Sequence, residues 1–320
     1  MRLLSKQFLF IILFCILSTG CHRDPGFEKL DLKYAKVGNF NDYIAPNGVW
    51  EVLLVCTTSE SSIKQSAKSF LHYATKETKT MAKLLNLKLN ITVLEGNDVN
   101  PHKVRSTIKE MIAKKRPAGA QKYMFSMLSF THGLNYKETH TPIPFMLCHP
   151  TKRTVANHET NLILSLDQLY KDLRENSAYD HIHVWAELCD KVPNGCEVAP
   201  QVSLLDVTTK GRKGENLKKL LFSVKSEIMV SSSYGQASCA EASGGFFSRS
   251  LFNAINEVAT SSISAKFEGA GGVFEHVTNN TVLYSQMIPN SSCVGQTPQC
   301  YVEDRLPSYG TSRNSGSSWD

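Results

Sequence analysis

The chain has 320 residues, of which 42% are hydrophobic and 20% charged, so it is long enough to bury one large core or two small ones. Its formal net charge is +6, but Arg2 and Lys6 belong to an apolar N-terminal segment and the other charges are spread thinly along the chain. No basic run is interleaved with aromatic residues, which argues against nucleic-acid binding.

The N-terminus has the pattern of a secretory signal. A basic start is followed by unbroken apolar residues at 8–17 and then by small residues that lead to Cys21. Such a run rises only about 15 Å as a helix, half the thickness of a bilayer core, so it is too short for a permanent span. We therefore expect residues 1–20 to be a signal peptide and residues 21–47, which lack periodicity, to be a tether.

The residues that end this signal, Ser-Thr-Gly-Cys at 18–21, resemble the lipobox of bacterial lipoproteins. The lipobox prefers Leu three residues before the cysteine, whereas Leu17 lies four before Cys21. The resemblance implies cleavage before Cys21, lipidation of its thiol, and a protein anchored to a membrane of the cell envelope, in the periplasm or at the cell surface. The alternative is an ordinary cleaved signal in which Cys21 is incidental.

The cysteines outside the signal region are odd in number. Of the nine in the chain, Cys15 lies in the signal and Cys21 at its edge, so at least one of the others stays unpaired in an oxidising compartment. Cys293 and Cys300 are candidates for a disulfide, a pairing that their spacing alone leaves open. No Cys-x-x-Cys or Cys/His zinc spacing occurs, so we predict no metal site and no cofactor.

Apolar runs and helical patterns alternate over residues 48–302. The predicted strands are residues 50–56, 87–94, 123–130, 181–188 and 227–232. The predicted helices are residues 61–85, 104–115, 164–173, with Ser165 as its cap, and 245–258. This alternation predicts an α/β fold with a mostly parallel central sheet and helices on both faces.

Three segments lack a regular pattern. Residues 135–159 and the polar segment 190–215 are expected to be loops. Residues 303–320 are rich in Ser and Gly toward their end and are expected to form a disordered tail.

Two chemically active side chains come directly after predicted strands. His132 follows one strand and Cys189 the next, and working residues of parallel α/β sheets gather beyond the carboxyl ends of the strands. An imidazole beside a thiol lowers the thiol pKa and later delivers a proton to the leaving group. The alternatives are a core histidine and a buried structural thiol. His181 and His183 share one face of their predicted strand and are interpreted as structural.

Four local motifs, in order, resemble the caspase-like cysteine peptidases, a family that includes metacaspases and bacterial relatives. Ser-Phe-Thr-His-Gly at 129–133 is similar to the family's catalytic His-Gly, and Glu-Leu-Cys at 187–189 to its catalytic Asp-x-Cys. Val-Ser-Ser-Ser at 230–233 followed by Gly-Gly-Phe-Phe-Ser-Arg-Ser-Leu at 244–251 resembles its strand, glycine turn and helix. Gln-Thr-Pro-Gln at 296–299 matches an element of metacaspase-like members.

The resemblance implies a caspase-like fold over residues 48–302 and assigns roles in it. Cys189 would be the nucleophile, His132 the base and then the acid, and the backbone of Gly133 an oxyanion donor. Glu187 would bind a basic P1 side chain of the substrate, which implies cleavage after Arg or Lys, and Ser232 would line the same pocket. The alternative for Glu187 is a salt bridge within the protein.

The chain departs from the family pattern around the nucleophile. The family has Asp where this chain has Glu187, and a small residue and Gly soon after the cysteine, whereas residues 190–195 delay the glycine. The basic residues at 210–213 lie where family members carry a self-cleaved linker, and the alternative is an exposed loop. No acidic cluster indicates calcium binding.

We therefore expect an exported cysteine endopeptidase, acting on protein or peptide substrates through a Cys189/His132 dyad. The alternative from another class is a catalytically inactive caspase-like module that binds partner proteins at the envelope. A non-peptidase hydrolase is the weakest alternative, because no Gly-x-Ser-x-Gly elbow is present.

Overall fold

The computed structural model describes six segments of the chain. They are residues 47–134, 143–152, 160–188, 212–233, 236–287 and 295–304. Contacts divide the chain into the units Met1–Ile44 and Ala45–Asp320, and the described residues all belong to the second. The predicted signal peptide, most of the tether and Cys21 lie outside the described residues, so the predictions for them are untested. No helix in the described segments is long and apolar enough to cross a bilayer.

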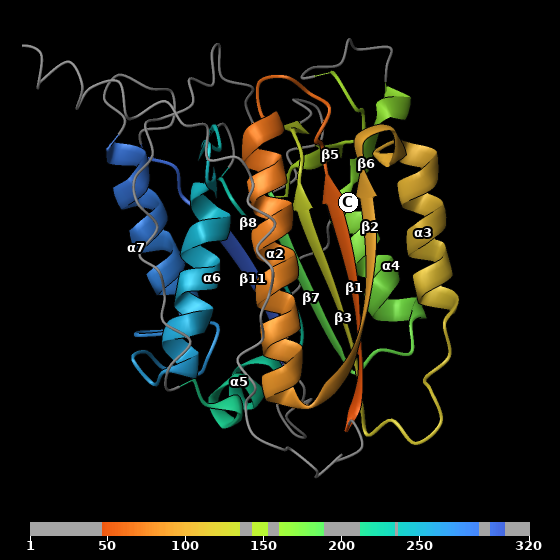
Figure 1. Ribbon diagram of the computed structural model, residues 1–320, viewed down its shortest axis with the longest axis vertical. Helices are drawn as coiled ribbons and strands as arrows, with labels where there is room; N and C mark the ends of the chain where they lie inside the picture. The colour runs from red at the N-terminus through yellow and green to blue at the C-terminus, as the bar shows by residue number, and fades with distance from the viewer. Residues whose placement is uncertain are drawn as a thin grey trace, which may run out of the picture. The chain divides into compact units, whose positions relative to one another are not determined.

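A six-stranded sheet lies at the centre, in the order β11-β8-β7-β3-β1-β2 (Figure 1). Its strands are β1 (Gly48–Cys56), β2 (Leu87–Glu95), β3 (Lys122–Phe130), β7 (His181–Glu187), β8 (Val224–Val230) and β11 (Gln299–Asp304). The first five pair in parallel, and β11 runs antiparallel to β8 at one edge. Strand β1 is buried along its whole length, whereas the edge strand β2 is partly exposed. This difference explains why β1 is apolar apart from Glu51, whereas β2 alternates between apolar and polar residues.

Helices cover both faces of the sheet (Figure 1). One face packs against α2 (Lys64–Leu85), α5 (Gly214–Leu221), α6 (Phe246–Ala259) and α7 (Val273–Gln286), and the other against α3 (Pro101–Ala113) and α4 (Leu166–Asn176). Successive residues of β1 supply the two cores in turn, with Val52 in the first and Leu53 in the second. The predicted α/β fold, with a mostly parallel sheet and helices on both faces, is confirmed.

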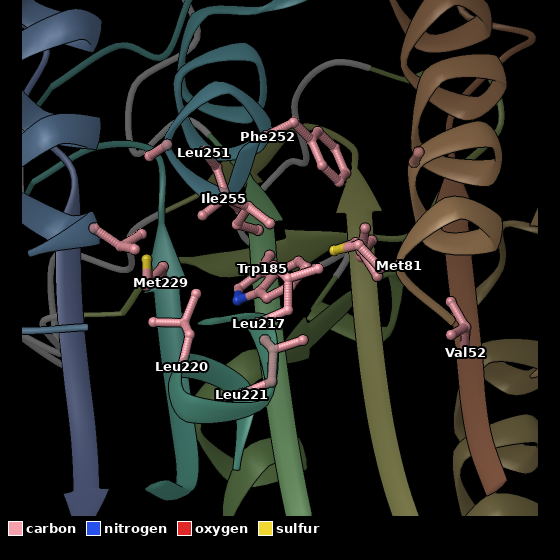
Figure 2. Packing of buried hydrophobic residues seen from close by; sticks show 14 of the residues in the cluster. Val52, Met81, Trp185, Leu217, Leu220, Leu221, Met229, Leu251, Phe252 and Ile255 are labelled. Carbon is pink, nitrogen blue, oxygen red and sulfur yellow. The ribbon is translucent and has the colours of Figure 1, made fainter. Parts of the chain in front are cut away.

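The first core fixes β7 against the helices. Figure 2 shows Trp185 of β7 beneath Phe252 of α6, and the two rings meet edge to face with centroids 6.4 Å apart. Leu217, Leu220 and Leu221 of α5 close the same core on its other side. Truncating a buried aromatic residue such as Phe252 to Ala typically costs about 3–5 kcal/mol. This packing holds in place the strand that leads to Cys189.

Smaller elements surround the sheet. A three-stranded antiparallel sheet contains β4 (Gly133–Leu134), β5 (Phe145–Leu147) and β6 (Ile163–Ser165), and a short hairpin contains β9 (Ala240–Glu241) and β10 (Gly244–Gly245). Two 3₁₀ turns, η2 (Gly96–Asp98) and η3 (Thr160–Leu162), complete the described structure.

Helix boundaries differ from the predicted ones by a few residues, and the caps explain two of the differences. Helix α3 begins at Pro101 rather than 104, because Asn100 caps it by accepting a hydrogen bond from the Lys103 N–H at 2.9 Å. Ser165 caps α4 as predicted, accepting from the Gln168 N–H at 3.1 Å, so the helix starts after it. Part of the predicted loops is ordered as β5 and α5, and the predicted tail begins inside β11, which includes residues 303 and 304.

Candidate active site

The candidate site lies where three parallel strands end together. Cys56 of β1 is in register with Phe130 of β3, and Phe130 is in register with Glu187 of β7. A narrow pocket lies at these strand ends, with a cavity volume of about 30 Å³, room for about two water molecules. The residues that line it are Ser62, Ile63, Ser66, Phe130, Thr131, His132, Glu187, Ser238, Cys239 and Ala240.

His132 is held at this edge by backbone hydrogen bonds to its neighbours on both sides. The Thr131 N–H donates to the Glu187 carbonyl at 3.3 Å, and the Leu147 N–H donates to the His132 carbonyl at 2.8 Å. The side chain is buried but lines the pocket. Gly133 follows as the first residue of β4 and pairs with Met146. The strand end and the small sheet thus fix His132 without using its imidazole.

The imidazole faces a second buried side chain, Glu60. Nε2 of His132 lies 3.5 Å from Oε2 of Glu60, and both side chains are about 95% buried. The same carboxylate oxygen accepts hydrogen bonds from the backbone N–H groups of Ser62 and Ile63, each at 3.1 Å, and from the Ser62 hydroxyl. Glu60 is therefore a preorganised acceptor beside the histidine.

Glu187 lines the same pocket, but its carboxylate binds the start of α6. Oε1 accepts from the Ser238 hydroxyl at 2.6 Å, and Oε2 accepts from the Ser248 N–H at 2.8 Å. Gly245, the N-cap of α6, has no side chain, and a Cβ there would lie 2.0 Å from Glu187 Oε2. Burial raises the pKa of Glu187 to about 7, although the hydrogen bonds from Ser238 and Ser248 lower it. No ion pair of Glu187 is formed within the described residues.

Ser232 is fully buried and supports the end of β7. Its hydroxyl donates to the Leu188 carbonyl at 3.1 Å, and the Ser231 hydroxyl both donates to that carbonyl and accepts from the Leu188 N–H. Ser232 is not among the residues that line the described pocket, and its role at P1 stays a prediction. The two serines fix the residue that precedes Cys189.

The Gln-Thr-Pro-Gln motif at 296–299 ties β8 to the pocket wall. Gln296 Nε2 donates to the Ser231 carbonyl at 2.8 Å and to the Ser238 hydroxyl at 3.1 Å, while its Oε1 accepts from the Cys239 N–H at 3.0 Å. Gln296 is buried, so these bonds replace hydration of its amide. The motif therefore has a structural explanation in this chain.

Cys239, on the same wall, is disulfide-bonded. The other described cysteines, Cys56, Cys148 and Cys300, are free, so the partner of Cys239 lies outside the described residues. The candidate pairing of Cys293 with Cys300 is therefore wrong. Burial raises the pKa of the Cys148 thiol to about 12, and those of Cys56 and Cys300 further, so these three thiols are unreactive.

Two further predictions concern segments at the limit of the described residues. Cys189 and residues 190–211 lie outside them, so the position of the nucleophile is untested. In the basic segment 210–213, the side chain of Arg212 is buried and pairs with Glu77 of α2 at 3.1 Å. Self-cleavage after Arg212 would have to break this ion pair, whereas Lys213 is exposed.

The roles of Glu60 and Ser238 were not predicted from the sequence, nor was the space that Gly245 leaves for the Glu187 carboxylate. The rule that singled out His132 also applies to Glu60, which closely follows the end of the buried strand β1. Ser238 and Gly245 gave no signal of their own, because their roles depend on where Glu187 lies. No group of three or more potential metal-ligating side chains occurs in the described part of the chain.

No family model matches this chain, and no curated protein matches it. Among solved structures, the chain is similar to the crystal structure of caspase-1 from Spodoptera frugiperda, with 9% sequence identity and a TM-score of 0.45. The similarity covers 80% of this chain and 86% of that one. A likeness this distant assigns no role to any residue of this chain.

Proposed function

We propose that this protein is a caspase-like cysteine endopeptidase in which His132 serves Cys189. The observation that carries the proposal is the register of β3 and β7. Phe130 pairs with Glu187, and His132 and Cys189 each follow two residues later. Segments that follow two adjacent parallel strands ending in register begin at the same edge of the sheet.

The chemistry of this pairing is acyl transfer. The imidazole of His132 takes the proton of the Cys189 thiol, and the thiolate attacks the peptide carbonyl to form a tetrahedral oxyanion. Backbone N–H groups, of which Gly133 supplies one in this proposal, stabilise that oxyanion. The protonated imidazole then delivers its proton to the leaving amine, and water hydrolyses the thioester.

For the substrate, we propose an Arg or Lys at P1, bound by Glu187. The supporting observation is that its buried carboxylate lines the same pocket as His132. The Glu187 carboxylate already accepts hydrogen bonds from Ser238, Ser248 and the Phe247 backbone, so a basic P1 group would have to replace some of them. The described pocket is too narrow for an arginine side chain, so its wall at residues 238–240 would have to move on binding.

The cellular location rests on the sequence and is proposed with the function. A signal peptide at 1–20, lipidation of Cys21 and a tether to residue 47 would place residues 48–302 at the surface of a membrane of the envelope. The disulfide at Cys239 supports an oxidising compartment, because disulfides persist there and are rare in the cytosol.

The test is hydrolysis of fluorogenic peptides with Arg, Lys, Asp or Asn at P1 by residues 22–320, beside Cys189→Ala. We expect cleavage after Arg or Lys that is lost in the variant. Cleavage only after Asp or Asn would keep the dyad and exclude Glu187 as the P1 acid.

The second candidate function is an inactive caspase-like module that binds partners at the envelope. The small volume of the pocket and the delayed glycine after Cys189 favour it. Absence of turnover with every peptide, together with no labelling of Cys189 by a thiol-reactive peptide probe, would support this candidate instead.

A further inference from the structure

The side chain of Glu60 reaches the imidazole of His132 from a part of the chain that no sequence motif singled out. The two residues follow the ends of the adjacent strands β1 and β3, and both are buried. His132 lines the pocket, and Glu60 lies behind it, beside the pocket-lining residues Ser62 and Ile63. The 3.5 Å between Nε2 and Oε2 is at the long limit of a hydrogen bond. In free enzymes such contacts are often long and tighten only when substrate binds.

We propose that Glu60 is a positioning residue that orients His132 and stabilises its protonated form, an inference that rests on the proposed peptidase function. With the Glu60 carboxylate at Nε2, the Nε2–H tautomer is favoured and Nδ1 keeps the lone pair that accepts the proton of the thiol. When the imidazole becomes an imidazolium during the reaction, the carboxylate offsets its charge in a site that water hardly reaches.

The surroundings of Glu60 suit this role. Two backbone N–H groups and one hydroxyl, from Ser62 and Ile63, hold the oxygen that faces His132, so the carboxylate does not reorganise as the histidine gains charge. These residues immediately precede α2, whose positive N-terminal end favours a negative charge there. A glutamate that served only as a helix cap would not need to face a second buried polar group.

Among the described residues, the other titratable group in the pocket is Glu187, and its position differs. Its oxygens face Ser238 and the start of α6, whereas the imidazole of His132 meets Glu60. The two carboxyls therefore have different roles in this proposal. Glu60 orients the histidine, and Glu187 binds the substrate.

The experiment compares Glu60→Gln with Glu95→Gln in the chain without its signal. Glu95 is the control, because it ends the neighbouring strand β2 and accepts from Thr58 at 3.4 Å, whereas the carboxylate that meets His132 is that of Glu60. We measure kcat, KM and the rate of alkylation of Cys189 by iodoacetamide as functions of pH. For Glu60→Gln we expect kcat to fall by about 10²- to 10³-fold with KM nearly unchanged.

The pH profile separates positioning from a merely structural role. Without the carboxylate the imidazolium is less stable, so the alkaline limb of the alkylation profile should shift to lower pH by about one unit. Glu95→Gln should leave kcat and this limb as in the wild type. Glu60→Asp, which keeps the charge on a shorter side chain, should lose part of kcat but retain the limb.

The outcomes for Glu60 and for the peptidase activity are distinguishable. An inactive wild type whose Cys189 is not labelled overturns the peptidase itself. An active wild type together with a Glu60→Gln variant of unchanged kcat and pH profile overturns the role of Glu60 alone. If Glu60→Gln does not fold, Glu60→Asp decides, because a fully active Asp variant with a shifted limb would contradict the proposal.

Discussion

The chain contains two buried histidine–glutamate pairs, and their settings differ. His132 and Glu60 meet at 3.5 Å beyond the strand ends, and His132 lines a pocket. His183 and Glu227 meet at 2.7 Å on the adjacent strands β7 and β8, in register and fully enclosed. Glu227 also accepts from the Trp185 indole, and the ring of Phe267 lies beside His183. No described pocket reaches this second pair.

The difference shows that residue type alone does not identify a site. The inner pair is closer and more deeply buried, yet no substrate can touch it, and Nε2 of His183 has no hydrogen-bond partner within the described residues. The pair at the strand ends has a longer contact, and its histidine lines the pocket. Position relative to the carboxyl ends of the strands therefore indicates which pair can take part in chemistry.

The largest expected effects are a loss of activity when His132 is replaced and a loss of stability when His183 is replaced. His132→Ala should lower kcat/KM by at least about 10³-fold, with a change in the free energy of unfolding of about 1 kcal/mol. His183→Ala leaves Glu227 buried without its partner, so it should lower the free energy of unfolding by about 3–5 kcal/mol and leave the activity per folded molecule within a few-fold. Urea unfolding and peptide hydrolysis measure the two quantities.

Both variants are compared with the wild type at the same pH and temperature. Loss of activity in a folded His183→Ala variant would break the distinction between the pairs. Full activity in His132→Ala would also contradict the distinction, and it would exclude His132 as the catalytic base.

Glu187 sharpens the comparison, because it is a third buried carboxylate and its partners carry no charge. Burial raises its pKa from the ordinary value of 4.5 to about 7 in the folded state, so the stability it contributes is complete below pH 4.5 and is lost as the pH rises through about 7. Relative to Glu187→Gln, the wild type should lose on the order of 2–3 kcal/mol of unfolding free energy over that range. Urea midpoints of both proteins at pH 4.5, 6, 7 and 8.5 measure this loss.

The matched control is Glu303→Gln, which removes a partly exposed carboxylate whose pKa is lowered by Arg174. That variant should show the opposite trend, because the stability contributed by Glu303 is present at neutral pH and is lost on acidification. Parallel pH curves for the wild type and Glu187→Gln would contradict the burial of an ionisable Glu187.

The elements that could be predicted from the sequence are those with a regular pattern within a single segment. The apolar run of β1, the helical spacing of α2 and the Ser165 cap predicted their elements, and His181 and His183 were correctly interpreted as structural. The alternation of Leu87, Leu89, Ile91 and Val93 with polar residues predicted strand β2, although not its place at the sheet edge. These features depend on contacts that repeat along a single segment, so one sequence suffices to see them.

The missed elements depend on distant partners. Helix α7 contains Thr, Asn and Val, which are weak helix formers, and it is held by packing on α6. Strand β11 is polar because it lies at a sheet edge, and α5 is short and charged. The roles of Glu60, Ser238 and Gln296 arise only when strand ends far apart in the chain meet, so no local pattern indicates them.

The smallest expected effect concerns the glycine that gives Glu187 its place. The backbone of Gly245, with φ −74° and ψ 150°, is open to any residue, so Gly245→Ala acts only through the contact of the new methyl group with the Glu187 carboxyl. We expect it to lower the free energy of unfolding by about 1–2 kcal/mol, because the carboxylate must leave Ser238 and Ser248.

The same substitution made in a Glu187→Ala background should cost about 0 kcal/mol, because the atom that the methyl group meets is gone. A double-mutant cycle by urea unfolding measures this coupling, and equal costs in both backgrounds would place Glu187 elsewhere. Activity adds a second readout, since a displaced Glu187 should weaken binding of Arg at P1 while alkylation of Cys189 by a small reagent is unaffected. That pattern would separate the role proposed for Glu187, binding of the substrate, from the role proposed for His132 and Glu60, activation of the thiol.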